Sequence, residues 1–515
     1  MMDKITNYFV KCEIYSLILQ ANSLSFTFIM SNISNLKEST AKGFFWAALS
    51  NGTQQVVMML IGIVLANILS VEDYGMVAML TAFSVIAGNL QEGGFTSALC
   101  VKKEARHEDF NAVFWLSMMV SVTVYVALFF CAPLIADFNH TPELTLLGRV
   151  IFIGFVFSSM GTAHAAYLFR NLMVKQKTMS QVLSSMLSGV FAIIAAVAGW
   201  GVWSLVVMDL SYKMIYTTLI WYFSPWRPSF NIDLRPAFRI FGFGSRLLVT
   251  NLLTTLNNQF LQTILGHYYP DKQVGQYSQA NKWNTMCSTL LTNMVGNVAQ
   301  PVLASVNEEE GRQVRIFRKM LRFTAMLSFP ALFGFAVIAP EFIPLTIGEK
   351  WLPCVPYLQT LSVVGAVLPL CQLFSNLIIS KQQSTTYLCS TAAFLVLQLT
   401  LVLLLYPYGV QILLYGISAL NVLWLFVWSI LARRLSGITV LQTLGDILPF
   451  LFAALLAIGG AACVGYFISN LLFCLLAKIV VAVMIYAVIM QLAKVQIWKE
   501  CVAFIFAKIL RKKQK

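Results

Sequence analysis

Long apolar stretches recur along the chain, and they limit its fold more than any other feature. A helix that crosses the hydrocarbon core of a bilayer needs about 20 mostly apolar residues, and stretches of this length recur from Phe44 almost to the C-terminus. Only 11% of the 515 residues are charged and the mean hydropathy is +0.76, which leaves too few polar side chains to cover a water-soluble body of this size. We therefore expect an all-α integral membrane protein.

The predicted number of transmembrane helices is about fourteen. Their spans are 43–69, 75–100, 111–136, 145–169, 179–199, 202–223, 240–266, 279–304, 318–340, 355–380, 385–407, 411–432, 447–469 and 473–494. Basic residues gather after every second span, whereas the alternate loops hold mainly acidic residues. Cytoplasmic loops carry an excess of Lys and Arg, so we expect an even number of spans with both termini in the cytoplasm. The net charge of +14 thus reflects topology and argues against nucleic-acid binding.

Motifs for metal, nucleotide or covalent chemistry are missing from the sequence. The ten cysteines form no CxxC pair, and the four histidines never approach metal-ligand spacing. There is no P-loop, no HExxH and no nucleophile elbow. We therefore expect no metal, no cofactor and no catalytic residue.

The first 37 residues precede the predicted membrane part. Residues 1–29 contain an apolar patch without a small-residue cleavage site of the usual kind, so they make a poor signal peptide. The sequence from Met30 is short and polar, and it leads through a basic flank into the first span. We expect translation to begin at Met30, with residues 1–29 as a gene-start artefact or a disordered tail.

Two segments of the chain resemble each other. KGFFWAALSNGTQQVVMMLIGIVLANILSVEDYGMVAM and RIFGFGSRLLVTNLLTTLNNQFLQTILGHYYPDKQVGQYSQA both pass from a basic residue, glycine and aromatics through a polar-spotted span into a short acidic loop. With Gly43 matched to Gly242, one inserted residue aligns Gly75 with Gly275. Both segments start on the same side, so we expect two six-helix lobes in a parallel repeat around a central cavity, related by an axis along the membrane normal.

This repeat divides the chain into predicted segments. They are an N-terminal extension (1–37), an N-lobe of helices 1–6 (38–224), a cytoplasmic linker (225–239), a C-lobe of helices 7–12 (240–434), two extra helices 13 and 14 (435–495) and a basic amphipathic tail (496–515). Helices 13 and 14 are almost wholly apolar apart from Asp446 and Lys478, so we expect them to face lipid rather than substrate. The tail is expected to lie on the anionic inner leaflet.

Several short motifs, taken in order, resemble a known family. KGFFW, LSVEDYGMVAML, QEGGFTSALCVKK and VGQYSQANKW are similar to segments of the polysaccharide-transporter family of the multidrug/oligosaccharidyl-lipid/polysaccharide (MOP) exporter superfamily, which includes Wzx-type flippases. The resemblance covers about residues 38 to 495. The family's usual aspartate late in the seventh helix is absent, because the sequence there reads Gln262-Thr-Ile-Leu-Gly266.

The resemblance implies a flippase. Such a protein moves an undecaprenyl-diphosphate-linked oligosaccharide, an O-antigen, capsule or exopolysaccharide repeat unit, across the bacterial inner membrane by alternating access between two lobes. The implied partners are the lipid-linked oligosaccharide, membrane lipids, and glycan polymerase and chain-length proteins. The alternative function is a cation-coupled exporter of small drugs or metabolites on the same fold. A binding site for cationic drugs would need more carboxylates than Glu92 and Asp209 provide.

A sugar diphosphate needs a wet cavity with cations for the phosphates and carboxamides or hydroxyls for the sugars. Polar residues follow one face of the seventh helix at i, i+4, i+8 and i+11, and polar positions recur in the first and eighth helices. The candidate substrate-binding residues are Arg246, Thr250, Thr254, Asn257, Asn51, Gln55, Lys282, Asn293 and Gln300.

The charged candidates each have a second interpretation. Arg246 contacts a phosphate or snorkels back to the cytoplasmic headgroups. Lys282, at the outer end of its predicted span, favours an interfacial anchor over a ligand. Asp209 precedes Lys213 by four residues, which favours an intrahelical ion pair. Glu92 either forms a salt bridge with Arg246 or binds a coupling proton or sodium ion.

Overall fold

The computed structural model is helical throughout the part of the chain that it describes. This part is residues 53–92, 99, 106–171, 173–230, 232–237, 252, 255, 259, 261–306, 309–381, 383–465 and 467–500, and it contains no strand. Ten of its helices are long and apolar enough to cross a membrane. The prediction of an all-α, multi-pass membrane protein is therefore confirmed. The N-terminal extension with Met30, and residues 501–515 of the tail, lie outside the described residues.

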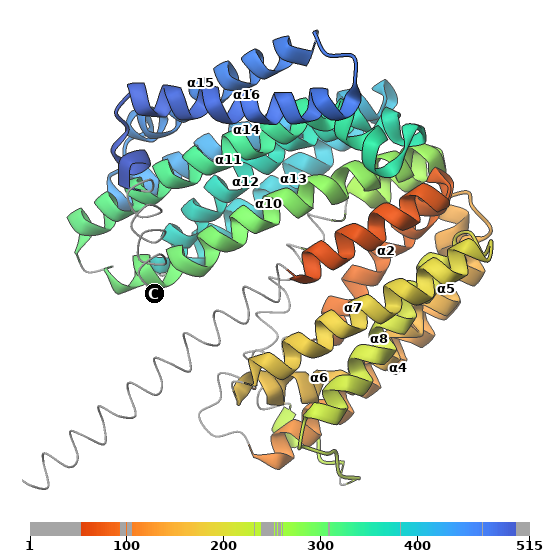
Figure 1. Cartoon of the computed structure of the whole chain (residues 1–515). Coiled ribbons are helices and arrows are strands. Elements are labelled where there is room, and N and C mark those ends of the chain that lie inside the picture. The colour runs from red at the N-terminus through yellow and green to blue at the C-terminus, as the bar shows by residue number, and fades with distance from the viewer. Residues whose placement is uncertain are drawn as a thin grey trace, which may run out of the picture.

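The first half of the chain forms one group of helices, here called the N-terminal bundle (Figure 1). Its members are the helical segment Thr53–Ile68, α2 (Val71–Glu92), α4 (His107–Phe138), α5 (Leu144–Phe152), α6 (Gly154–Arg170), α7 (Val174–Val197) and α8 (Trp203–Phe223). α4 packs on α5 and α6, and α7 packs on α8. The predicted span 145–169 is divided between α5 and α6, which are separated by Ile153.

The second half forms the C-terminal bundle. After helical residues 261–268 it contains α10 (Asp271–Ser305), α11 (Glu310–Ile347), the 3-10 helix η1 (Glu349–Cys354), α12 (Val355–Ser380), α13 (Ser384–Leu405), the 3-10 helix η2 (Tyr406–Tyr408), α14 (Val410–Ser436), α15 (Val440–Gly465) and α16 (Leu471–Leu492). α12 is central, because it packs on α10, α11 and α14. α15 and α16 pack on each other and on α11, on the side away from the N-terminal bundle (Figure 1).

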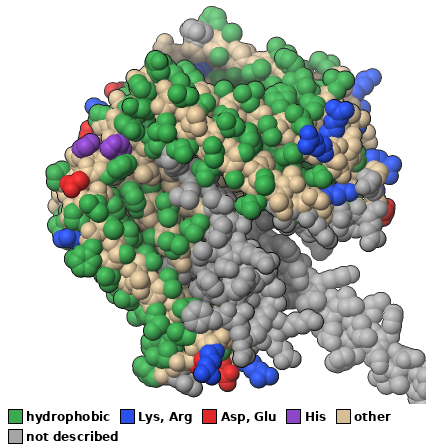
Figure 2. Space-filling view, turned by 180° about the vertical axis from the view of Figure 1, so that it is seen from behind, with side chains coloured by type: hydrophobic (Ala, Val, Ile, Leu, Met, Phe, Trp, Pro, Cys, Tyr) green, Lys and Arg blue, Asp and Glu red, His purple; other side chains and the backbone are tan. Residues whose placement is uncertain are grey.

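The two bundles meet along α2 and α10. These helices lie side by side, and from this contact the bundles diverge toward the end of the molecule where α11 begins (Figure 1). Hydrophobic side chains are spread widely over the described part of the face seen in Figure 2, and most of its charged side chains lie toward the margins. This distribution suits a body whose flanks contact lipid.

Several helices begin earlier than the apolar stretches predict. α2 starts at Val71 because Ser70 and Asp73 form a capping box, in which the Ser70 amide donates to Asp73 Oδ2 at 2.9 Å and the Asp73 amide donates to Ser70 Oγ at 3.1 Å. α15 starts at Val440, where Thr439 and Gln442 exchange the same pair of bonds. Capping residues are polar, so they lie outside the apolar windows that mark a span.

Candidate functional site

α2 and α10 touch through their backbones at two glycines. A Cβ atom on Gly75 would lie 2.1 Å from the carbonyl oxygen of Asp271, and one on Gly275 would lie 2.1 Å from the carbonyl oxygen of Val71. No real Cβ tolerates such a distance, so only glycine permits this approach. Each glycine meets the carbonyl four residues before the other glycine. The contact is therefore reciprocal, as in a two-fold arrangement.

The C-terminal end of segment Thr53–Ile68 is held by the C-terminal bundle. Lys350 Nζ donates to the carbonyl oxygens of Asn67 at 2.8 Å and Leu69 at 2.7 Å, and Trp351 Nε1 donates to that of Ala66 at 2.9 Å. Asn67 Nδ2 in turn donates to the Thr346 carbonyl at 2.7 Å. The last carbonyls of a helix have no partner within it, so η1 satisfies those of the first segment, while the side chain of Asn67 satisfies a carbonyl at the end of α11.

Further side chains connect α2 with the helix that precedes α10. Gln262 Nε2 donates to the Ala78 carbonyl at 2.7 Å, and Asn89 Nδ2 donates to Thr255 Oγ1 at 2.7 Å. An ionised aspartate at position 262 could not donate such a bond, because a carboxylate only accepts. The departure from the family pattern at Gln262 therefore supplies a contact between the bundles.

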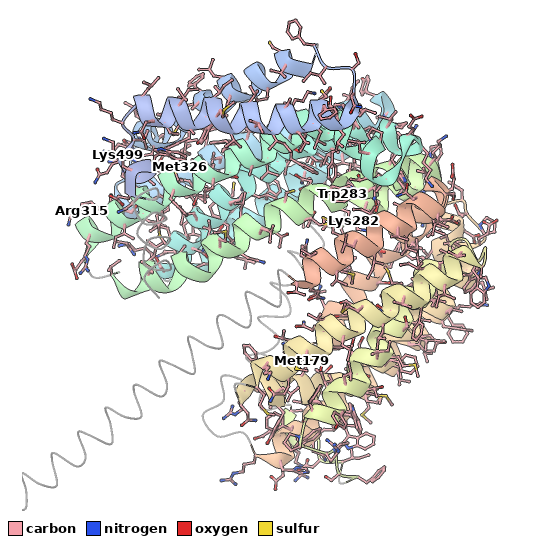
Figure 3. All side chains as sticks on the ribbon, in the orientation of Figure 1. Met179, Lys282, Trp283, Arg315, Met326 and Lys499 are labelled. Carbon is pink, nitrogen blue, oxygen red and sulfur yellow. The ribbon has the colours of Figure 1, made fainter. Side chains whose placement is uncertain are left out.

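Lys282 lies where α10 passes the N-terminal bundle (Figure 3). Its ammonium nitrogen is 2.7 Å from the point that a Cβ on Gly62 would occupy, so it contacts segment Thr53–Ile68. Among the described residues the half-buried Lys282 side chain has no hydrogen-bond or ion-pair partner. This placement differs from the interfacial anchor that the sequence favours, because the ammonium group faces protein rather than lipid headgroups.

Other polar groups of α10 near Lys282 also lack hydrogen-bond partners within the ranges that the structure describes. Both amide atoms of Gln279, the indole nitrogen of Trp283 and the amide oxygen of Asn284 are buried with no hydrogen bond among the described residues. An unsatisfied buried polar group costs about 1–3 kcal/mol. Such groups favour water or a polar ligand beside this part of α10.

The remaining predicted site residues divide into three groups. Gln55 is half-buried and lies seven residues before Gly62, on the same face of the segment. Asn293 is exposed on α10, and Asp209 forms the predicted ion pair, with Lys213 Nζ at 2.6 Å. Outside the described residues lie Asn51, Arg246, Thr250, Thr254, Asn257 and the side chains of Glu92 and Gln300. The structure therefore brings the helices of Gln55 and Lys282 together and leaves the stripe of the seventh helix as a prediction.

Three ion pairs, made by the buried carboxylates of Asp446 and Glu341, join α15 and α16 to α11. Asp446, which is 2% exposed, binds Arg318 Nε at 2.6 Å and Arg322 Nε at 2.6 Å. Glu341 and Lys478 lie 2.6 Å apart, with 12% and 9% of their side chains exposed. In the sequence, Asp446 and Lys478 stand out as charges in otherwise apolar helices. The sequence does not indicate which residues pair with them.

The described residues contain no group of three or more His, Cys, Asp and Glu side chains that could hold a metal ion. The site offers the ammonium group of Lys282 where the two bundles meet, and carboxamide and indole groups on the neighbouring turns of α10. This chemistry suits the recognition of a polar, anionic molecule.

Comparison with known proteins gives consistent matches over most of the chain. The model of a family described as polysaccharide biosynthesis protein matches residues 64–356. The teichuronic acid biosynthesis protein TuaB of Bacillus subtilis is 26% identical over 334 residues, which are 64% of this chain and 69% of TuaB. The lipopolysaccharide biosynthesis protein WzxC of Escherichia coli is 25% identical over 358 residues, 67% of this chain and 71% of WzxC.

Solved structures share the fold. The lipid II flippase MurJ, in an inward closed conformation, superposes with a TM-score of 0.73 over 87% of this chain and 98% of MurJ, at 11% identity. An inward-facing multidrug resistance MATE transporter of the MOP superfamily superposes with a TM-score of 0.61 over 76% of this chain and 98% of the transporter, at 15% identity. At these identities the likeness concerns the fold alone.

Proposed function

Because the chain belongs to the polysaccharide biosynthesis protein family of membrane transporters, and is therefore not an enzyme, we propose that it is a flippase for a lipid-linked oligosaccharide. The cargo is an O-antigen, capsule or exopolysaccharide repeat unit on undecaprenyl diphosphate. It moves from the cytoplasmic to the outer leaflet of the bacterial inner membrane by alternating access. The names of the relatives, which concern teichuronic acid and lipopolysaccharide biosynthesis, support this class of cargo.

The proposed mechanism needs two lobes that move against each other. We propose about fourteen transmembrane helices, with lobes at 38–224 and 240–434, a linker at 225–239 and the extra helices at 435–495. The reciprocal contact of Gly75 with Gly275 supports the repeat, because residues matched by the sequence alignment occupy equivalent places on α2 and α10. A contact of this kind is what two parallel repeats produce around an axis along the membrane normal.

The orientation follows from charge. The basic start of α11 holds Arg312, Arg315, Arg318 and Lys319, so we propose that this end and both termini are cytoplasmic. The bundles meet at the opposite, outer end and diverge toward the cytoplasm (Figure 1). This state would admit cargo from the cytoplasmic side, and outward opening would require the α2–α10 contact to separate.

Lys282 is the single observation that carries the proposal. A charged side chain within a membrane bundle is costly, by at least about 2.5 kcal/mol at a helix centre, and usually serves a substrate or ion. Lys282 has no partner among the described residues and lies where the two bundles meet. We propose that it binds the diphosphate, with Gln55, Asn51, Arg246, Thr250, Thr254, Asn257, Asn293 and Gln300 lining the rest of the path.

Coupling and partners extend the proposal. Glu92 remains the candidate for a coupling proton or sodium ion, whereas Asp209 is already neutralised by Lys213. That ion pair also weakens the alternative of a cationic-drug exporter, which would need free carboxylates. Glycan polymerase and chain-length proteins are the proposed protein partners.

Deletion of the gene followed by lipid analysis tests the proposed cargo. Undecaprenyl-linked repeat units should accumulate on the cytoplasmic side of the membrane. If they do not, the flippase proposal fails.

Complementation of the deletion strain then tests whether Lys282 binds the diphosphate. Lys282→Ala should abolish transport and Lys282→Arg should retain part of it, while Lys272→Ala, which alters an exposed lysine at the start of the same helix, should behave as wild type. Arg246→Ala and Arg246→Lys should follow the same pattern if Arg246 contacts phosphate. Normal transport by Lys282→Ala would remove Lys282 from the site.

A further inference from the structure

A groove runs between α13 and α14, on the flank of the C-terminal bundle. Its volume is about 410 Å³, and its lining includes Cys389, Ser390 and Ala393 of α13 and Trp424, Val427 and Leu431 of α14. Nearly all of the exposed lining is carbon. A groove of this kind in a membrane helix pair suits a hydrocarbon chain.

Two polar groups in the groove have no hydrogen-bond partner in the described part of the chain. The hydroxyl of Ser390 and the indole nitrogen of Trp424 are buried without a hydrogen bond among the described residues. Both groups can donate to an oxygen, and the hydrocarbon interior of a bilayer offers none. The occupant of the groove should therefore carry an acceptor oxygen as well as an apolar chain.

Cations stand at one end of the groove. Arg434 follows Leu431 by three residues and Val427 by seven, so it lies on the same face of α14, one turn beyond the lining. Arg433 is adjacent, and both side chains are exposed with no ion pair in the described part of the chain. The end of the groove nearest the basic side of the molecule therefore attracts a negative headgroup.

We propose that this groove binds an anionic phospholipid of the leaflet next to Arg433 and Arg434. The headgroup phosphate pairs with Arg434, the acyl chain lies along Ala393 and Val427, and an ester carbonyl accepts hydrogen bonds from Ser390 and Trp424. Basic pockets between membrane helices bind anionic headgroups in this way. The site takes a lipid of stated charge and does not depend on which saccharide the protein moves.

The lipid-linked cargo is a less suitable occupant. α12 packs on both α10 and α14, so it stands between Lys282 and the groove. A diphosphate at Lys282 and a phosphate at Arg434 therefore belong to different molecules. The groove is a second lipid site on the C-terminal bundle.

Lipid retention by the purified full-length protein tests the site. The protein is titrated with phosphatidylglycerol or phosphatidylethanolamine, and bound lipid is counted by native mass spectrometry. Wild type should retain phosphatidylglycerol at least about threefold better, which corresponds to about 0.7 kcal/mol. The double variant Arg433→Ala with Arg434→Ala should lose this preference, and Ala393→Phe, which fills the groove, should lose the bound lipid.

The control and the contrary outcomes are equally specific. Arg235→Ala removes an exposed cation of the linker and should leave retention unchanged. Equal retention of the two lipids by wild type, or an unchanged preference in the arginine variant, would overturn the proposal. Displacement of phosphatidylglycerol by undecaprenyl phosphate at equal concentration would assign the groove to the cargo lipid and overturn it too. The arginines are exposed, so their variant decides the matter even if Ala393→Phe fails to fold.

Discussion

Two helix contacts in this molecule rest on opposite chemistry. α2 meets α10 through glycine backbones, and neutral hydrogen bonds join α2 to the helix before α10. By contrast, α11 holds α15 and α16 with buried ion pairs at Asp446 and Lys478. Removing one member of a buried ion pair leaves an uncompensated charge, which costs about 3–5 kcal/mol. Separating α2 from α10 at the two glycines leaves no buried charge without its partner, because the contact consists of backbone atoms and of apolar side chains such as Met79 and Val274.

The difference indicates which elements move together. α15 and α16 are fixed to α11 and belong mechanically to the C-terminal bundle. The contact between α2 and α10 contains no ion pair among their described side chains, and the charge-assisted bonds between the bundles come from Lys350 at the end of the first segment. In the proposed mechanism the bundles would therefore open at the glycine contact while the ion-paired contact stays closed.

The largest expected effect comes from breaking the fixed contact. Lys478→Met leaves the Glu341 carboxylate buried without its partner, and we expect the free energy of unfolding to fall by about 3–5 kcal/mol. Thermal unfolding of the purified protein measures this loss. Glu341→Leu combined with Lys478→Met removes both charges and should restore most of the stability. A single variant as stable as wild type would mean that the pair does not fix α16.

A smaller effect is expected at the glycine contact. Gly75→Ala places a methyl group 2.1 Å from the Asp271 carbonyl oxygen, so α2 and α10 must move apart, at about 1–3 kcal/mol for overpacking. Gly275→Ala should act alike because the contact is reciprocal. Complementation assays should show reduced transport for both. Gly88→Ala is the control on the same helix, because a Cβ atom on Gly88 would meet no neighbouring heavy atom within 4 Å. Equal defects in all three variants would exclude a special contact at Gly75.

The hydrogen bond between Asn89 and Thr255 should contribute less. Asn89→Leu removes a bond of 2.7 Å between α2 and the helix before α10, and we expect a loss of about 0.5–1.5 kcal/mol. A double-mutant cycle with Thr255→Val measures the coupling between the two side chains. Strict additivity would show that the bond adds nothing to the contact. Asn421→Leu removes a bond within α14 and serves as the control.

The smallest effect is expected at an exposed ion pair between α11 and Glu500, which follows α16 in the chain. Lys319 Nζ lies 2.6 Å from Glu500, but 61% and 43% of these side chains are exposed. Lys319→Ala should therefore change the unfolding free energy by only about 0–1 kcal/mol. Thermal unfolding at low and high salt measures it, since salt screens exposed charges. A loss as large as that of Lys478→Met would show that burial does not set the strength of these pairs.

The sequence predicts the class of fold better than the contacts of its charges. Apolar stretches indicate helices such as α12 and α16 because the bilayer demands about 20 apolar residues, but they miss helix starts such as Val71, which polar caps determine. The intrahelical pair of Asp209 with Lys213 could be read from spacing alone. Lys282 could not, because its surroundings depend on how two distant helices cross. For the same reason the sequence shows Asp446 as a charged residue in an otherwise apolar helix, but it does not show that Arg318 and Arg322 are its partners.

The glycine contact also sets the geometry of any movement between the bundles. From Gly275 to Ser305, α10 continues for 30 residues, which span about 45 Å at 1.5 Å per residue. A tilt of about 10° around the contact would shift the far end of α10 by about 8 Å by this lever alone. A small rotation at the contact of the two glycines is thus multiplied by helix length into a wide displacement at the basic end of the molecule.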